Sequence, residues 1–216
     1  MISTTMSDYF SLTKPRVVIL LQITAICTVF VHESLEGGLS EGSAETMLVV
    51  LIGGYLTAGG ANAINMWYDR DIDPKMRRTE NRAIPMGKVS PESALFFGIS
   101  ISSVGVAWFY FMSNEVAAFW SAFSILFYVL IYSMWLKRST PQNIVIGGIA
   151  GSTPPVIGWA ASVEGLSISN NSLEESIVSL FDLGSPIPWF MFILIFLWTP
   201  PHFWALALYK SKEYAE

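Results

Sequence analysis

Charged residues are scarce in this chain. They make up 13% of its 216 residues, whereas a soluble globular domain has roughly 25%. Cys27 is the single cysteine, which excludes a disulfide framework and a cysteine-based zinc or iron–sulfur site. The N-terminus lacks the basic stretch and apolar run of a cleavable signal peptide, so we expect the first apolar segment to remain in the membrane. Hydrophobic residues reach 52%, which indicates a polytopic membrane protein.

Six stretches are long and apolar enough to cross a bilayer, which takes roughly 20 helical residues. They are residues 17–31, 47–67, 94–112, 116–136, 144–163 and 188–209. A spanning segment must satisfy its own backbone hydrogen bonds in lipid, so we expect an all-α transmembrane bundle in a single domain, 1–216. Outside the spans, we expect residues 164–186 to form an irregular connection and His32 to lie exposed in another loop.

The basic residues are distributed on one side of this arrangement. All 12 Lys and Arg residues precede the first span, follow the sixth, or lie in the connections after the second and fourth. The opposite connections carry acidic charges without Lys or Arg. The positive-inside rule therefore predicts that the N-terminus and the basic loops are cytoplasmic. Because the membrane topology accounts for the positions of the basic residues, we expect no nucleic-acid partner.

The end of the second span carries a polar pattern. Asn65, Asp69 and Asp73 recur every four residues, a spacing that predicts one face of a continuous helix. Like charges at this spacing repel, so a compensating cation is expected, and oxygen ligands suit Mg²⁺ shared with substrate phosphates. Arg78 and Arg82 follow in a basic loop and could bind the remaining phosphate oxygens. The pattern favours a diphosphate site over a solvated helix end beside a cytoplasmic loop.

Four blocks of the chain resemble UbiA-type intramembrane prenyltransferases, and within them the haem-farnesylating members. The blocks are residues 12–16, 65–82, 136–161 and 199–209. The resemblance implies transfer of a farnesyl group from farnesyl diphosphate to a vinyl group of haem b. The product would be haem O for respiratory terminal oxidases, made with Mg²⁺ in the plasma (cell inner) membrane.

The resemblance also implies roles for individual residues. Asn65, Asp69 and Asp73 would be catalytic and would hold the metal ion. The other implied residues are Arg78, Arg82, Lys137, Arg138 and Lys212 for diphosphate binding, Tyr209 and Glu213 for a second acidic motif, and His202 as a haem contact.

The chain departs from the family pattern in three respects. Ala83 stands where the family usually has proline after the basic loop, and Glu213 stands where it typically has aspartate. The family has about nine helices and this chain provides six spans, so we expect a form incomplete at its C-terminus. Oligomerisation or a second polypeptide, including a haem-handling partner, could close the unfinished ring of helices.

Three other interpretations remain open. A UbiA-type enzyme could prenylate an aromatic quinone precursor such as 4-hydroxybenzoate instead of haem. An inactive membrane fragment could bind haem or lipid. The proline-rich stretches 153–155 and 199–201 also resemble the broken helices of transporters, although no inverted repeat accompanies them.

Overall fold

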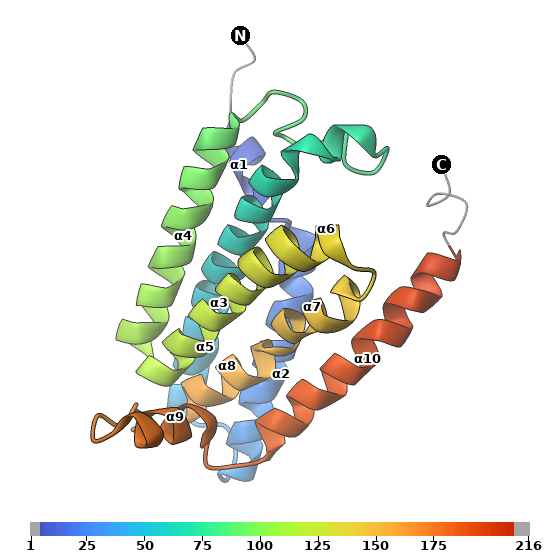
Figure 1. Cartoon of the computed structure of the whole chain (residues 1–216). Helices are drawn as coiled ribbons and strands as arrows, with labels where there is room; N and C mark the ends of the chain where they lie inside the picture. Colours follow the sequence, from blue (N-terminus) through green and yellow to red (C-terminus); the bar gives the residue numbers. More distant parts are fainter. Residues whose placement is uncertain (1–4, 210–216) are drawn as a thin grey trace.

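The computed structural model describes residues 5–209, and within that range every regular element is a helix (Figure 1). The elements are α1 (Met6–Leu12), α2 (Pro15–Leu35), α3 (Glu41–Tyr68), η1 (Asp69–Asp71), η2 (Asp73–Lys75), α4 (Pro91–Met112), α5 (Glu115–Leu126), η3 (Phe127–Leu136), α6 (Lys137–Ser139), α7 (Asn143–Ser152), α8 (Pro154–Ser162), α9 (Leu173–Phe181) and α10 (Ile187–Tyr209). Six helical segments within residues 5–209 are long and apolar enough to cross a membrane. This confirms the all-α transmembrane bundle.

The first span is longer than predicted. It begins at Pro15 and runs 21 residues to Leu35, because proline is well suited to the first helical position. The helix therefore contains His32, and the prediction that this histidine is exposed in a loop is wrong. Its side chain is buried, and its ring packs edge-on against Trp159 with the ring centroids 4.9 Å apart.

The connection from 164 to 186 is not irregular throughout, as the sequence had suggested. Residues Leu173–Phe181 form α9, which Figure 1 places at the end of the bundle opposite α1. Ser172 caps this helix by accepting a hydrogen bond from the Glu175 amide at 3.1 Å. Leu173, Ile177 and Phe181 recur every four residues, which makes α9 amphipathic.

Three tryptophan indoles fix the C-terminal end of α9 and the residues directly after it to the bundle. Each donates a hydrogen bond to a main-chain carbonyl in residues 180–183: Trp120 to Leu180 at 2.9 Å, Trp189 to Phe181 at 2.9 Å and Trp159 to Leu183 at 3.1 Å. Buried indole N–H groups need such partners. The outer connection is therefore attached to three different spans.

Helices α3 and α4 approach each other closely where glycines face one another. A Cβ atom added at Gly60 would lie 2.7 Å from the carbonyl oxygen of Gly98, and one added at Gly98 would lie 3.0 Å from the carbonyl oxygen of Gly60. Small residues allow such backbone contact between membrane helices. This packing aligns the second half of α3, which carries the polar residues described below.

Two spans depart from regular α-helix. Pro154 begins α8 directly after Thr153 and divides the fifth span into α7 and α8, since proline cannot donate the helical hydrogen bond. In the fourth span, the ten residues Phe127–Leu136 form a π-helix. Such segments are rare and are frequently found at functional sites.

The last span, α10, has few protein neighbours. Only 6% of its most apolar stretch is buried, compared with 56% for α3. Its exposed side chains include Phe190, Leu194, Trp198 and Trp204. With six apolar spans and their exposed apolar faces, the chain is an integral membrane protein.

Candidate functional site

Asn62 anchors the polar end of α3 to the corner between α1 and α2 and to the fourth span. Its side-chain amide donates a hydrogen bond to the Thr13 carbonyl at 3.1 Å and accepts one from the Tyr128 hydroxyl at 3.4 Å. Asn62 is buried, and a buried amide is costly unless its groups are paired. The anchor sets the position of Asn65, one turn further along α3.

Helix α3 ends at Tyr68, and two short 3₁₀ turns carry the chain from Asp69 to Lys75. The prediction of one continuous helical face from Asn65 to Asp73 is therefore wrong. Pro74 prevents a regular α-helix through Asp73, because it has no N–H to donate and its ring clashes with the carbonyl four residues earlier. The turns nevertheless leave Asp69 and Asp73 buried, with 0% and 2% of their surfaces exposed.

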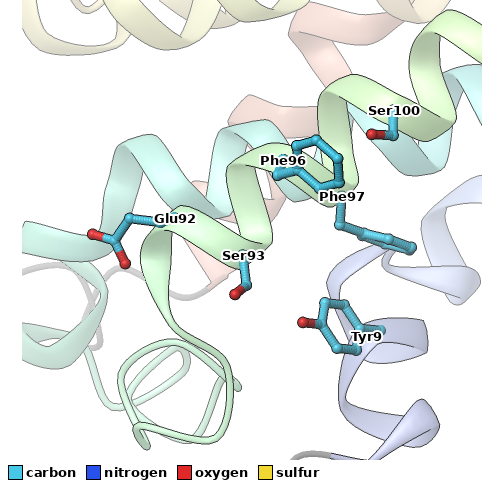
Figure 2. Close-up of a pocket in the computed structure, with 6 residues that line it drawn as sticks. All are labelled: Tyr9, Glu92, Ser93, Phe96, Phe97 and Ser100. Atoms are coloured by element: carbon cyan, nitrogen blue, oxygen red, sulfur yellow. The ribbon is translucent and has the colours of Figure 1, made fainter.

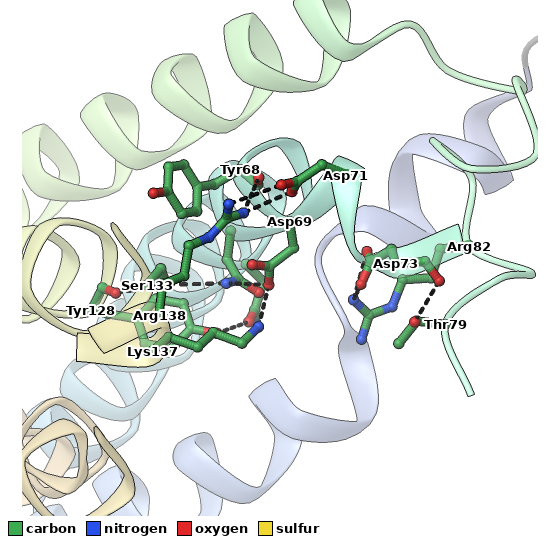
Figure 3. Close-up of polar contacts among 12 residues, drawn as sticks. Tyr68, Asp69, Asp71, Asp73, Thr79, Arg82, Tyr128, Ser133, Lys137 and Arg138 are labelled. Atoms are coloured by element: carbon green, nitrogen blue, oxygen red, sulfur yellow. Dashed lines mark hydrogen bonds and ion pairs between the residues drawn. The ribbon is translucent and has the colours of Figure 1, made fainter. Parts of the chain in front are cut away.

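Asp69, labelled in Figure 3, forms the centre of the site together with Asn65, to which it is hydrogen-bonded. The Asn65 amide nitrogen donates to Asp69 Oδ2 and to Ser133 Oγ, both at 3.0 Å. Lys137 forms an ion pair with Asp69 Oδ2. Within residues 5–209, Asp69 Oδ1 is buried and has no hydrogen-bond partner, which leaves a carboxylate oxygen available to a ligand.

Asp73 lies in a second, adjoining pair. Arg82 Nη1 donates to both carboxylate oxygens of Asp73 at 2.8 Å, and the Thr79 hydroxyl donates to the Asp73 carbonyl at 2.8 Å. These bonds fold the basic loop back onto the end of α3. Arg82 is thereby brought to the site as the sequence suggested.

Arg138 binds a different aspartate, Asp71, which the sequence pattern did not single out. Its guanidinium donates to both carboxylate oxygens of Asp71 at 2.7 and 2.8 Å and lies 4.4 Å from the centre of the Tyr68 ring. Both residues of this pair are partly solvent-exposed. Arg138 therefore lies at the rim of the cluster, next to the part-buried Lys137 and its buried partner Asp69.

The π-helix supplies the side of the site that faces α3. Ser133 Oγ donates to the Tyr128 carbonyl, five residues earlier, at 2.9 Å while it accepts from Asn65. Tyr128 stacks on Tyr132 with ring centroids 5.4 Å apart. The segment thus presents Tyr128 and Ser133 to the end of α3, and Lys137 follows directly after it.

Lys14 also belongs to the site, although the sequence analysis gave it no role beyond a charge in the block 12–16 before the first span. Its ammonium group donates to Asn65 Oδ1 at 2.7 Å. Burial, reinforced by the neighbouring cations Arg82 and Lys137, lowers the pKa of Lys14 to about 7. The sequence feature that could have indicated this role is the position of Lys14 directly before Pro15, the proline that begins the first span.

Several predicted residues lie away from this cluster. Arg78 is exposed, without a described ion pair or hydrogen bond inside the 5–209 range, and Tyr209 is 86% exposed at the end of α10. His202 is exposed on α10 and stacks on Trp198 with ring centroids 4.5 Å apart. Lys212 and Glu213 lie outside the described residues.

The donor set at the end of α3 suits a hard divalent cation. Two buried carboxylates and one amide oxygen are too few for an all-protein cage, and no group of three or more His, Cys, Asp and Glu side chains in residues 5–209 could form one. Mg²⁺ commonly uses one or two carboxylates and takes the remaining oxygens from phosphate and water. The unpaired Asp69 Oδ1 fits that use.

Two hollows lie elsewhere on the helices and differ in chemistry. One, of about 490 Å³, lies between α1 and α4, and Figure 2 shows its lining residues Tyr9, Glu92, Ser93, Phe96, Phe97 and Ser100. The other, of about 690 Å³, is an apolar groove between α2 and α3 that includes Ile23, Cys27 and Tyr55. The linings of both lack Lys and Arg, so the end of α3 is the better candidate for an anionic substrate.

Comparison with known proteins agrees with this geometry. The family described as UbiA prenyltransferases matches residues 23–216. The chain is 44% identical to the protoheme IX farnesyltransferase of Gluconacetobacter diazotrophicus, over 99% of this chain and 60% of the relative. It is 46% identical to the proteins of that name from Parvibaculum lavamentivorans and Roseobacter denitrificans, over 96% and 97% of this chain and 58% and 59% of those relatives. The chain thus spans about three fifths of their length, and no solved structure matches it.

Proposed function

This chain belongs to the UbiA prenyltransferase family, and on that premise we propose that it transfers a farnesyl group from farnesyl diphosphate to a vinyl group of haem b, forming haem O. The observation that carries the proposal is the pair of buried carboxylates, Asp69 and Asp73, each bound to a basic side chain at the end of a membrane helix. The names of the relatives support haem as the acceptor. The basic loops would face the cytoplasm from the plasma (cell inner) membrane.

The residues of the site would separate the leaving group from the allylic carbon. A divalent metal ion bound through Asn65, Asp69 and Asp73 would supply neutralising charge to the diphosphate. Lys137 and Arg82 would bind the phosphate oxygens and stabilise the negative charge that grows on them. Further candidates for diphosphate binding are Arg78, Arg138 and Lys212. The candidates for a second acidic motif are Tyr209 and Glu213.

The reaction itself needs no acid–base pair. The carbon–oxygen bond to diphosphate breaks, and diphosphate leaves with the electron pair. The vinyl π electrons of haem form the new carbon–carbon bond to the farnesyl carbon. Water adds to the resulting cation and releases a proton, which gives a hydroxyethylfarnesyl group. The stacked rings of Tyr128 and Tyr132 would offer π faces to the positive charge.

The direct test is an assay of the detergent-purified chain with haem b, farnesyl diphosphate and Mg²⁺, in which haem O is detected by its mass. Asp69→Ala is expected to lower the rate by at least about a hundredfold, the loss typical for removal of a preorganised charge-stabilising group. EDTA should abolish the product. Glu80→Gln, which changes an exposed acid in the same loop, is the matched control and should retain wild-type activity.

The outcomes separate the alternatives. Product from 4-hydroxybenzoate and not from haem b would keep the prenyltransferase and change its acceptor. A folded chain that makes neither product would exclude the proposal and favour an inactive binding protein.

We propose His202 as a haem contact, supported by its exposed imidazole beside Trp198. His202→Ala should weaken haem b binding, followed by its Soret absorbance, and leave diphosphate binding unchanged. Unaltered haem binding would remove His202 from the proposal.

A further inference from the structure

Each of the three proposed metal-binding side chains is bound by one basic residue. Lys14 donates to Asn65 Oδ1 at 2.7 Å, Lys137 pairs with Asp69 Oδ2, and Arg82 pairs with both oxygens of Asp73 at 2.8 Å. These basic residues come from three separate parts of the chain: the start of α2, the end of the fourth span and the loop after α3. The proposed ligands are therefore held by internal cations.

Lys14 occupies its position at a conformational cost. It is the single non-glycine residue with positive φ in residues 5–209, with φ 51° and ψ 62°. A non-glycine residue in this left-handed region is disfavoured and persists where its surroundings fix it. The preceding residue, Thr13, is fixed by Asn62 at its carbonyl and by the Tyr55 hydroxyl at 2.8 Å. The strained corner directs the ammonium group to Asn65.

We propose that Lys14, Lys137 and Arg82 exchange partners as a set when metal and diphosphate bind together. The three basic side chains release Asn65, Asp69 and Asp73 to the metal ion and bind the diphosphate instead. The inference rests on the proposed function and adds Lys14 to the residues that contact the substrate. It also means that metal and diphosphate each bind poorly alone. The substrate would enter as its metal complex.

Metal or diphosphate alone would bind poorly because each would leave charged groups at the site without a partner of opposite charge. Metal ion alone would displace Lys137 from Asp69 and leave a part-buried ammonium group without a partner, which is unfavourable. Diphosphate alone would bring negative charge next to the buried carboxylates Asp69 and Asp73. When both bind, the metal ion takes the carboxylates, the diphosphate takes the basic residues, and every charge remains paired.

The test measures binding of Mn²⁺ and inorganic pyrophosphate to the detergent-purified chain. Free Mn²⁺ is counted by its electron paramagnetic resonance signal, and the metal–pyrophosphate association without protein is measured and subtracted. Pyrophosphate is expected to raise the Mn²⁺ affinity of the wild-type chain at least fivefold, the lower end of typical couplings between binding sites of about 5- to 150-fold.

Two variants locate the coupling. Lys14→Met should bind Mn²⁺ alone more tightly, because Asn65 Oδ1 is released, and should lose most of the enhancement by pyrophosphate. Lys137→Met should do the same through Asp69, and it serves where Lys14→Met does not fold. Lys75→Met is the control, because Lys75 is an exposed lysine in the connection after α3 that also carries Arg82. It should keep the wild-type Mn²⁺ affinity and the wild-type enhancement by pyrophosphate.

Two results would overturn the inference. Mn²⁺ affinity that pyrophosphate leaves unchanged would remove the linkage while the proposed function stands. Wild-type coupling in folded Lys14→Met would assign Lys14 a purely structural role. A folded wild-type chain that binds neither probe in any combination would instead contradict the proposed function itself.

Discussion

Gly60→Ala is the sharpest test of the packing that positions the site. A Cβ atom at this position would lie 2.7 Å from the Gly98 carbonyl oxygen and 2.8 Å from the Ser102 amide nitrogen. Ordinary van der Waals contact begins at 3.4 Å, so α3 and α4 must separate by about 0.7 Å (3.4 minus 2.7). The added Cβ would also meet the Ser102 hydroxyl oxygen, which could rotate away. The Gly98 oxygen and the Ser102 nitrogen are main-chain atoms, so rotation of a side chain cannot relieve those two contacts. Overpacking of this kind costs about 1–3 kcal/mol.

Gly151→Ala is the matched control, because no atom lies within 4 Å of the added Cβ. Both substitutions replace a helical glycine and gain about 1 kcal/mol of helix propensity. The difference between the two variants therefore isolates the steric cost. At about 2–4 °C per kcal/mol for a chain of this size, Gly60→Ala should melt roughly 2–12 °C below Gly151→Ala. Thermal unfolding in detergent, followed by circular dichroism, measures this difference. Equal melting temperatures would show that α3 and α4 do not depend on this contact.

Three further predictions concern the remaining elements. Asn114→Ala removes the N-cap of α5 and a 2.7 Å hydrogen bond to α8, and it should lower the unfolding free energy by about 1–2 kcal/mol; a thermal melt equal to wild type would contradict this. Trp120→Phe keeps an aromatic ring but loses the hydrogen bond to Leu180, so amide exchange at the C-terminal end of α9 should accelerate about 2- to 10-fold, consistent with about 0.5–1.5 kcal/mol. The pKa of Asp8 lies below its ordinary value because Thr5 donates to it; this contribution to α1 is present above the ordinary pKa and is lost as pH falls through the lowered one. Thr5→Ala should return the pKa of Asp8 toward 3.8 in an NMR titration, and an unchanged value would refute the assignment.

The sequence was sufficient for the span count and the acidic cluster. Helix hydrophobicity and length depend on local composition, which is why all six spans were located. Asn65 and Asp69 were correctly placed together because one helical turn separates them. Asp73 was predicted on the same face, and Pro74 redirected the chain there. In its folded position Asp73 meets Arg82, a contact set by the path of the loop.

The missed features depend on contacts between distant parts of the chain. Lys14 reaches Asn65 only because α2 packs beside α3, and no spacing within either helix indicates that pair. The partner of Arg138 was hidden for the same reason, since Asp71 lies 67 residues away. His32 was assigned to a loop because its span has a polar end. Its burial follows from the contact with Trp159.

The π-helical segment Phe127–Leu136 also bears on how the chain tolerates changes in length. Successive residues are rotated from one another by about 100° in an α-helix and by somewhat less in the wider π-helix. Removing a single residue anywhere in the segment would therefore turn Lys137 and Arg138 away from their aspartates by about that angle, even if every remaining side chain were preserved. Conservative substitutions leave this rotation unchanged. Insertions and deletions should therefore be tolerated far less well than replacements in this span, and natural variation there should consist of exchanged residues at constant length.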